Sequence, residues 1–178
     1  MSIIIVDVEA DGPCPGLYSM VSFGAVSIKD DLKSTFYGET APITDIWVPE
    51  ALAISGVTRE QHLTFSRPEP VMWDFSAWIN SNYSGRPIFV SDNPAFDWQF
   101  INYYFHKYIG FNPFGHSARR IGDFYSGLKQ DWYAANNWRH LCKTKHTHHP
   151  VDDATGAAEG LVAMAKKFNI TLPRGELK

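Results

Sequence analysis

Three segments in the first forty residues carry the apolar pattern of β-strands. Residues 2–8 (SIIIVDV) are almost continuously apolar, which predicts a buried strand. Residues 20–28 (MVSFGAVSI) and 34–40 (STFYGET) follow, separated from each other by the polar, turn-forming stretch KDDLK. Because their connections are short, we expect the three strands to pair as an antiparallel meander.

Helical spacing of apolar residues dominates the rest of the chain. The stretch 69–82 has an apolar stripe that ends near Gly85, and Pro87 then opens a fourth strand, PIFVS. Further helices are predicted at 95–108, 119–129, near 137–142, and from about 152 to 168. An antiparallel start followed by strands alternating with helices predicts an α/β fold, with a mixed sheet covered by helices.

Length and composition agree with one globular domain. The chain has 178 residues, of which 44% are hydrophobic and 20% charged, enough to bury a sizeable core. No stretch approaches the roughly 18 consecutive apolar residues of a membrane helix, and the N-terminus lacks a basic start, so we expect neither a membrane span nor a signal peptide. Two cysteines, Cys14 and Cys142, are too few for a disulfide framework, which predicts reduced thiols and a cytoplasmic protein.

Charge is distributed unevenly along the chain. Residues 1–90 carry 5 Lys and Arg against 11 Asp and Glu, whereas residues 91–178 carry 11 against 8. The second half contains a basic stretch interleaved with aromatic residues: Arg119, Arg120, Lys129, Trp132, Tyr133, Trp138, Arg139, Lys143 and Lys145. This mixture suits a single-stranded nucleic acid, whose phosphates are neutralised and whose bases stack. A solvated basic face beside buried aromatic residues is an equal alternative.

The first candidate site lies at the end of the opening strand. Asp7 and Glu9 are two residues apart, so on a strand their side chains point to the same face. Adjacent carboxylates repel each other unless a cation lies between them, and oxygen ligands suit Mg²⁺ or Mn²⁺. The alternative is an ordinary strand exit with solvated acids.

Asp97 follows the fourth strand and lies in the first turn of the next predicted helix. A carboxylate is favoured there by the helix dipole alone, which is the alternative to a ligand role. Asp92 and Asn93 are typical turn or capping residues and need no further function.

The third candidate site combines His148 with Asp153, which falls in the first turn of the last helix. A histidine titrates near neutral pH and is suited to removing a proton from water. The alternative is that Asp152 or Asp153 caps the helix and His148 is a surface residue. A zinc site is a rival interpretation, because five possible ligands lie close together in sequence: His140, Cys142, His146, His148 and His149.

Taken together, these motifs resemble the DEDDh (DnaQ-like) 3′→5′ exonucleases of the RNase H-like superfamily. Asp7-x-Glu9 resembles the first motif, Asn93-x-x-Phe96-Asp97 the second, and His148-x₄-Asp153 the third, and the resemblance covers roughly residues 3–165. The related DEDDy branch would have tyrosine at the position of His149. Two departures are Ala10, where relatives often have Thr, and Pro150, where many have Ala.

The resemblance implies a single exonuclease domain over residues 1–178 with an RNase H-like mixed five-stranded sheet. It implies four carboxylate ligands for two Mg²⁺ or Mn²⁺ ions about 3.5–4 Å apart. These ligands are Asp7, Glu9, Asp97 and Asp153, with His148 as the general base. The loop from Glu9 to Gly12 would bound the pocket for a 3′ end.

The implied partner is a single-stranded nucleic acid with a free 3′ end. The size of the chain is similar to that of compact stand-alone bacterial or phage exoribonucleases, which favours RNA and a homodimer. DNA hydrolysis by the same site is the nearest alternative. A non-catalytic nucleic-acid-binding module of the same fold and an interaction protein with a structural metal are others. Tyr18 and Trp47 could stack on the last base, although core packing is the more common role of such residues.

Overall fold

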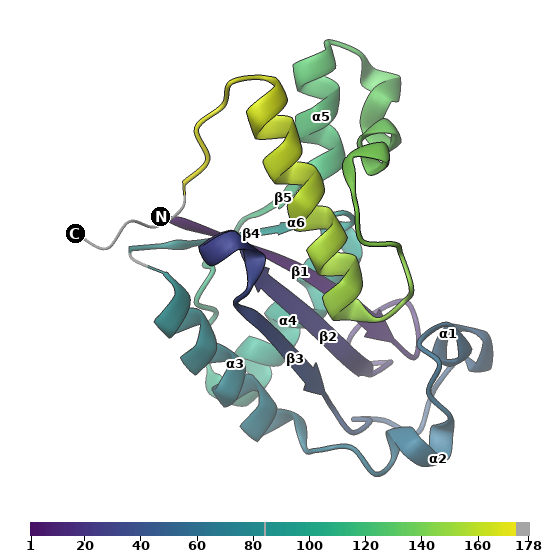
Figure 1. The fold of residues 1–178 in the computed structure, drawn as a ribbon. Coiled ribbons are helices and arrows are strands. Elements are labelled where there is room, and N and C mark those ends of the chain that lie inside the picture. Colours follow the sequence, from purple (N-terminus) through teal and green to yellow (C-terminus); the bar gives the residue numbers. More distant parts are fainter. Residues whose placement is uncertain (84, 174–178) are drawn as a thin grey trace.

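A five-stranded mixed sheet with the strand order β3-β2-β1-β4-β5 forms the centre of the protein (Figure 1). The computed structural model describes residues 1–83 and 85–173. Strands β1, β2 and β3 are antiparallel, and β4 and β5 run parallel to β1, which confirms the predicted fold class. The strands are β1 (Ser2–Ala10), β2 (Met20–Ser27), β3 (Thr35–Glu39), β4 (Pro87–Ser91) and β5 (Ala118–Arg120).

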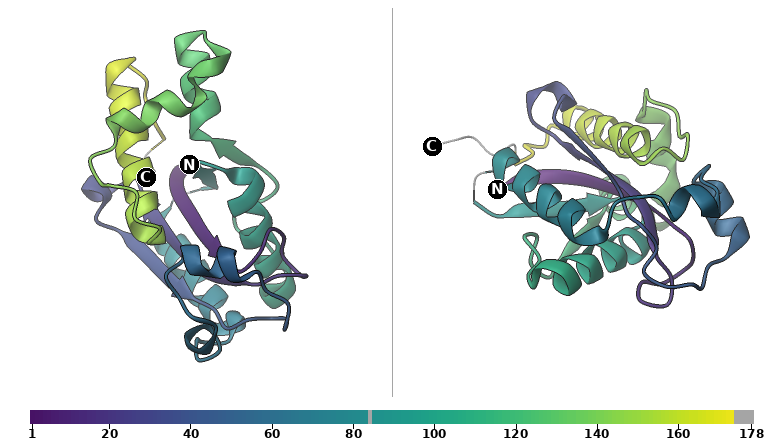
Figure 2. Two further views of the ribbon diagram at one scale, coloured as in Figure 1. Left: turned by 90° about the vertical axis from the view of Figure 1, so that its right-hand side faces the viewer. Right: turned by 90° about the horizontal axis from the view of Figure 1, so that it is seen from below.

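Helices cover both faces of this sheet, as the view from below in Figure 2 shows. Helices α3 and α4 pack on one face, and α5 and α6 pack on the other. The helices are α1 (Pro49–Ile54), α2 (Arg59–His62), α3 (Pro68–Asn82), α4 (Pro94–Ile109), α5 (Ile121–Lys129) and α6 (Pro150–Lys167), with 3₁₀ segments η1 (Asp30–Leu32) and η2 (Trp132–Leu141). Within residues 1–83 and 85–173, no helix is both long and apolar enough to cross a membrane.

The alternation of side chains along β1 determines which face receives the acidic residues. Ile4, Val6 and Val8 belong to the core under α3 and α4, whereas Ile3 and Ile5 belong to the core under α5 and α6. Because the side-chain period of a strand is two, Asp7 and Glu9 continue the second series. The two acids therefore face the side of the sheet on which α6 lies.

Three parts of the fold differ from the sequence predictions. Residues 118–120 form the edge strand β5 instead of beginning a helix, because they pair with β4 in a contact distant in sequence. Helices α1 and α2 were not predicted, although α1 has proline at its start and α2 has a capping box between Thr58 and Gln61. The short helix expected near 137–142 is a longer 3₁₀ segment, η2.

Gly24 allows the first turn of α6 to lie directly on the sheet. It is the cross-strand neighbour of Asp7, so the two residues share a face. A Cβ atom at Gly24 would lie 2.4 Å from both the carbonyl carbon of Pro150 and the amide nitrogen of Val151. A side chain here would therefore push away the turn that carries Asp153.

We expect Gly24→Ala to destabilise the protein by about 1–3 kcal/mol, because the contacted atoms are backbone and must shift. The melting temperature should fall by roughly 2–4 °C per kcal/mol in a chain of this size. Gly127→Ala in α5 is the matched control, since a Cβ there meets nothing within 4 Å. Equal melting temperatures for the two variants in differential scanning calorimetry would refute this account of Gly24.

Candidate active site

Three carboxylates from β1 and α6 meet at one end of the sheet. Asp7 and Glu9 extend from the end of β1, and Asp153 extends from the first turn of α6. One oxygen from each of the three lies within 4.8 Å of the others. Residues separated by more than 140 positions in sequence thus form one acidic cluster.

Asp97 joins this cluster from the opposite layer. Among the described strands, β4 pairs with β1 only as far as Ile5. Beyond that point, the backbone N–H of Val8 on β1 donates a hydrogen bond to Asp97 Oδ1 at 3.2 Å instead. The Asp97 side chain is buried, and repulsion from it contributes to raising the pKa of Asp7. The start of α4 therefore places a fourth carboxylate against β1.

The loop before α6 wraps around the carboxylate of Asp153. The backbone N–H of Thr147 donates to Oδ1 at 2.9 Å, and that of His148 donates to Oδ2 at 3.1 Å. His148 adopts a left-handed conformation with φ of 61°, which is uncommon for residues other than glycine, and the two bonds help to hold it. Its Nδ1 lies 3.7 Å from Glu9 Oε1 and its side chain is 49% exposed, so the imidazole is close to the acids and open to water.

The acidic cluster is electrostatically costly without a cation. Burial is the largest cause that raises the pKa of Asp7 well above its ordinary value, followed by repulsion from Asp97 and Glu9. Burial, and then repulsion from Asp153, raises the pKa of Glu9 to about 7. Burial also raises the pKa of Asp97 to about 7. Such a group of acids fits a hard divalent cation with oxygen ligands.

Comparison with known proteins agrees with this geometry. The chain is 37% identical over 164 residues, 88% of its length, to an Escherichia coli protein named 3′-5′ DNA exonuclease Cap18, and the match covers 87% of that protein. The chain belongs to the DEDDh family of 3′→5′ exonucleases, and the protein is a hydrolase. No protein-family model matches the chain.

Solved structures of DEDDh and related exonucleases share the fold. The nuclease domain of 3′hExo, described as a DEDDh family member, has a TM-score of 0.73 at 16% identity, covering 93% of this chain and 92% of that one. Cell-death related nuclease 4 has a TM-score of 0.72 at 15% identity, with 93% and 64% covered. Escherichia coli exonuclease I has a TM-score of 0.65 at 16% identity and extends well beyond the match, with 93% and 41% covered. These likenesses establish the RNase H-like fold.

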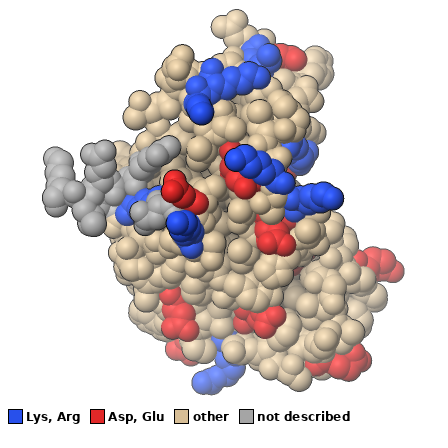
Figure 3. Space-filling view, in the orientation of Figure 1, with Lys and Arg blue, Asp and Glu red and all other residues tan. Residues whose placement is uncertain are grey.

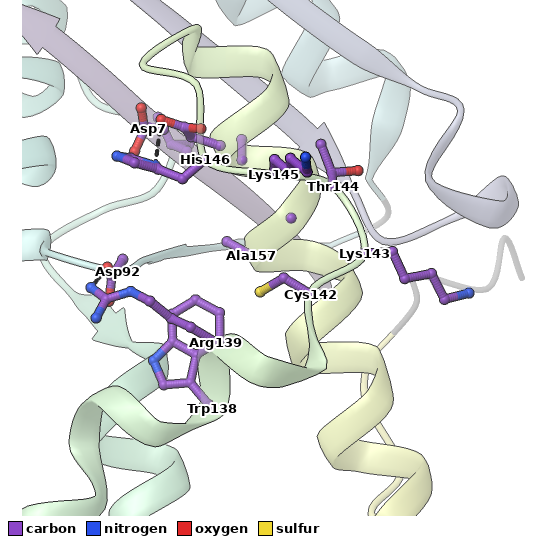
Figure 4. A pocket seen from close by; sticks show the side chains of 14 residues that line it. Asp7, Asp92, Trp138, Arg139, Cys142, Lys143, Thr144, Lys145, His146 and Ala157 are labelled. Carbon is purple, nitrogen blue, oxygen red and sulfur yellow. Dashed lines mark hydrogen bonds and ion pairs between the residues drawn. The ribbon is translucent and has the colours of Figure 1, made fainter. Parts of the chain in front are cut away.

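The five residues predicted from the DEDDh motifs lie together, and their roles as metal ligands and general base stay predictions. A pocket of about 410 Å³ opens beside Asp7 and Asp153, between α6 and the segment from Trp138 to His146 (Figure 4). Arg139, which lines it, pairs with the carboxylate of Asp92. The sequence analysis interpreted Asp92 as a turn or capping residue and did not predict this ion pair.

The basic and aromatic stretch divides into buried and exposed parts. Trp138 is 2% exposed, as the alternative of buried aromatic residues predicted, whereas Trp132 and Tyr133 are 87% and 89% exposed. In Figure 3, Lys and Arg side chains lie over α6 and the segment before it, with some Asp and Glu side chains among them, while the lower part of that face carries mostly Asp and Glu. The basic surface beside the DEDDh site consists of Arg139, Lys143 and Lys145, which line the pocket next to Asp7 and Asp153.

The loop after β1 is braced by residues that the sequence motifs did not identify. The buried carboxylate of Asp11 forms an ion pair with Arg59 on α2 at 3.1 Å. Arg59 also lies over the ring of Trp47, and Gly12 packs against Tyr18. Both Tyr18 and Trp47 are half-buried and take part in this packing, which agrees with the structural role favoured for them.

Of the five residues considered as zinc ligands, all within the described part of the chain, only two come together. His146 Nδ1 lies 2.7 Å from Asp153 Oδ2, and its ring lies 4.3 Å from that of His148. His149 instead stacks on Tyr37, with ring centroids 5.0 Å apart. The DEDDh motifs do not include His146. Its position two residues before His148 was the one sequence feature that could have indicated its contact with Asp153.

The acidic cluster predicts how the stability of the metal-free protein depends on pH. Folding raises the pKa of Glu9 from 4.5 and that of Asp97 from 3.8, each to about 7, so the folded state binds more protons than the unfolded state between these values. The contribution of these two groups to the free energy of unfolding therefore falls as pH rises from about 4 to about 7.

Asp7→Asn should raise the melting temperature of the metal-free protein at about pH 8, because it removes one of the repelling carboxylates. The gain expected is roughly 2–4 °C for each kcal/mol of repulsion relieved. The same variant should lose most of the stabilisation that added Mg²⁺ or Mn²⁺ gives the wild type. Asp45→Asn, at an exposed position, is the control, and a lower melting temperature for Asp7→Asn than for this control would contradict the prediction.

Proposed function

We propose that the protein hydrolyses single-stranded DNA one nucleotide at a time from its 3′ end. The observation that carries the proposal is the convergence of three acids on β1 and α6 with Asp97 and His148. The preference for DNA is supported by the name of the 37% identical relative, 3′-5′ DNA exonuclease Cap18. The expected preference for RNA rested on the similarity in chain length to compact exoribonucleases. No finding supports it, so RNA is the second candidate substrate.

The acidic cluster fits divalent cations, because its carboxylates lie close together and the pKa values of Asp7 and Glu9 are raised. We assign Asp7, Glu9, Asp97 and Asp153 as the ligands of two ions, for which an oxygen-only ligand set favours Mg²⁺ or Mn²⁺. When bound, the ions neutralise these acids and stabilise negative charge on the attacking and leaving oxygens of the phosphodiester.

His148 serves as the general base in this proposal. Its Nδ1 faces Glu9 at 3.7 Å, which leaves Nε2 to accept a proton from the attacking water. The backbone bonds of Thr147 and His148 to Asp153 fix the base relative to the acids. A positioned base of this kind contributes about 10²–10⁴ in rate.

The basic surface beside the site would hold the strand that leads to the 3′ end. Arg139 lies next to the pocket that opens beside Asp7, and Lys145 also lines this pocket. Phosphates of a single strand are neutralised by such groups. We also propose that residues 1–178 act as one exonuclease unit, and the homodimer and cytoplasmic location stay predictions that size-exclusion chromatography and cell fractionation would test.

Asp7→Ala should abolish hydrolysis, and His148→Ala should lower the rate by about 10²–10⁴ while still binding Mg²⁺ or Mn²⁺. His116→Ala, an exposed histidine on another loop, is the control. The assay is a ladder of a 5′-labelled single-stranded oligonucleotide with Mg²⁺, Mn²⁺ or EDTA, with cation binding followed by calorimetry. A wild-type rate for His148→Ala would refute the role of His148 as the base. Cleavage in the presence of EDTA would refute the requirement for cations.

Matched DNA and RNA oligonucleotides of one sequence should separate the two substrate assignments. We expect faster shortening of the DNA, with a 3′ label released at once as a mononucleotide and a 5′ label retained on a decreasing series. Faster digestion of RNA would refute the preference for DNA and support the preference for RNA that chain size suggested. Blocking the 3′ hydroxyl end should protect either strand, and internal cleavage of a blocked strand would contradict exonuclease action.

A further inference from the structure

Two possible cation sites overlap at the end of α6. The first consists of carboxylates alone, from Asp7, Glu9 and Asp153. The second consists of the imidazoles of His146 and His148 with the same Asp153. In each set, the candidate ligand atoms lie within 4.8 Å of one another. Asp153 belongs to both sets, so a cation held by the two imidazoles can draw this carboxylate away from a cation held by Asp7 and Glu9.

The second set is held in place by the loop that encloses Asp153. His146 Nδ1 lies 2.7 Å from Asp153 Oδ2, and the two imidazole rings are 4.3 Å apart in an edge-to-face arrangement. The residue between the histidines, Thr147, is bound through its backbone N–H to the other oxygen of Asp153. The side chains of His146 and His148 are 66% and 49% exposed, so an ion can reach them from solvent and small rotations of the rings can close the site.

The two ligand sets differ in the metals that they prefer. Mg²⁺ takes hard oxygen ligands and is bound weakly by imidazole. Zn²⁺ is bound well by imidazole nitrogen together with a carboxylate, and three protein ligands with one open position are a frequent arrangement for it. A set with two nitrogens and one oxygen therefore selects a different metal from the oxygen-only set beside it.

We propose that His146, His148 and Asp153 form a Zn²⁺ site that is mutually exclusive with the catalytic arrangement. This inference rests on the function proposed above, because it assumes that Asp153 and His148 take part in hydrolysis. Zinc bound there withdraws the general base and one carboxylate at the same time. Zn²⁺ is therefore an inhibitor that competes with Mg²⁺, and His146 is the residue that gives this chain its affinity for zinc.

Calorimetric titration of the metal-free protein with Zn²⁺ tests the site directly. His146→Ala should weaken the zinc affinity at least about tenfold, because even the loss of a group that only supports a metal ligand costs about 10–100-fold. The side chain of His146 is exposed, so the fold should tolerate the change. His116→Ala, also exposed, should bind zinc as the wild type does. Equal affinities in all three proteins would overturn the proposal.

Competition and inhibition test whether the two sites exclude each other. Excess Mg²⁺ should lower the apparent zinc affinity of the wild type, and zinc should slow its hydrolysis of a labelled oligonucleotide. Inhibition of each variant is expressed relative to its own rate without zinc, and His146→Ala should need at least about tenfold more zinc. Zinc that binds through His146 without slowing hydrolysis, or without responding to Mg²⁺, would refute mutual exclusion.

These measurements separate a failure of the inference from a failure of the proposed function. If no nucleic acid is hydrolysed but His146→Ala weakens zinc binding, the zinc site stands and the nuclease proposal fails. If hydrolysis occurs as proposed but zinc affinity does not depend on His146, only the zinc site fails.

Discussion

The burial of neighbouring carboxylates, which also repel one another, is the constraint on which the rest of this structure depends. Asp7, Glu9, Asp97 and Asp153 are held against one end of the sheet. Burial there disfavours the charged forms of Asp7, Glu9 and Asp97, and repulsion from neighbouring acids adds to this effect at Asp7 and Glu9. Apolar cores on both faces of the sheet supply the favourable free energy that holds them there. The unfavourable electrostatics is what makes the site a good receptor for cations, because an ion relieves repulsion that the fold has already imposed.

Asp153 is the point at which the layers of the protein meet. Its oxygens accept two backbone N–H groups from the preceding loop, and His146 contacts it from solvent. The first turn of α6 reaches this position because Gly24 presents no side chain to it. The position of the Asp153 carboxylate thus depends on helix packing, and its bonds orient the loop of His148. The same carboxylate is within reach of both the oxygen-only ligand set and the set that contains His146 and His148.

The charge of the protein is arranged around this acidic centre. The surface over α6 and the preceding segment is rich in Lys and Arg, although the chain has a net charge of −3 (Figure 3). The Arg139–Asp92 ion pair connects that basic segment to the end of β4 beside the acids. Cations at this centre would act on the phosphate at the reacting 3′ end, and the basic side chains would neutralise the phosphates of the strand that leads to it. The fold itself is shared with solved nuclease structures at 15–16% identity, so it tolerates changes at most positions of the chain.

Apolar periodicity was sufficient to predict the strands β1 to β4 and the main helices, because it is a property of neighbouring residues. The five site residues were predicted from the resemblance to the DEDDh motifs, since each motif by itself also fitted a purely structural role. The edge strand β5 could not be predicted, since it exists only through pairing with β4. The same holds for the 2.7 Å contact between His146 and Asp153. The sequence left open whether the aromatic residues of the basic stretch are buried, and only the structure shows that Trp138 is buried and Trp132 exposed. Periodicity specifies which face of an element is apolar, but the distance between two elements follows from how their surfaces pack, and packing is decided by residues far apart in the chain.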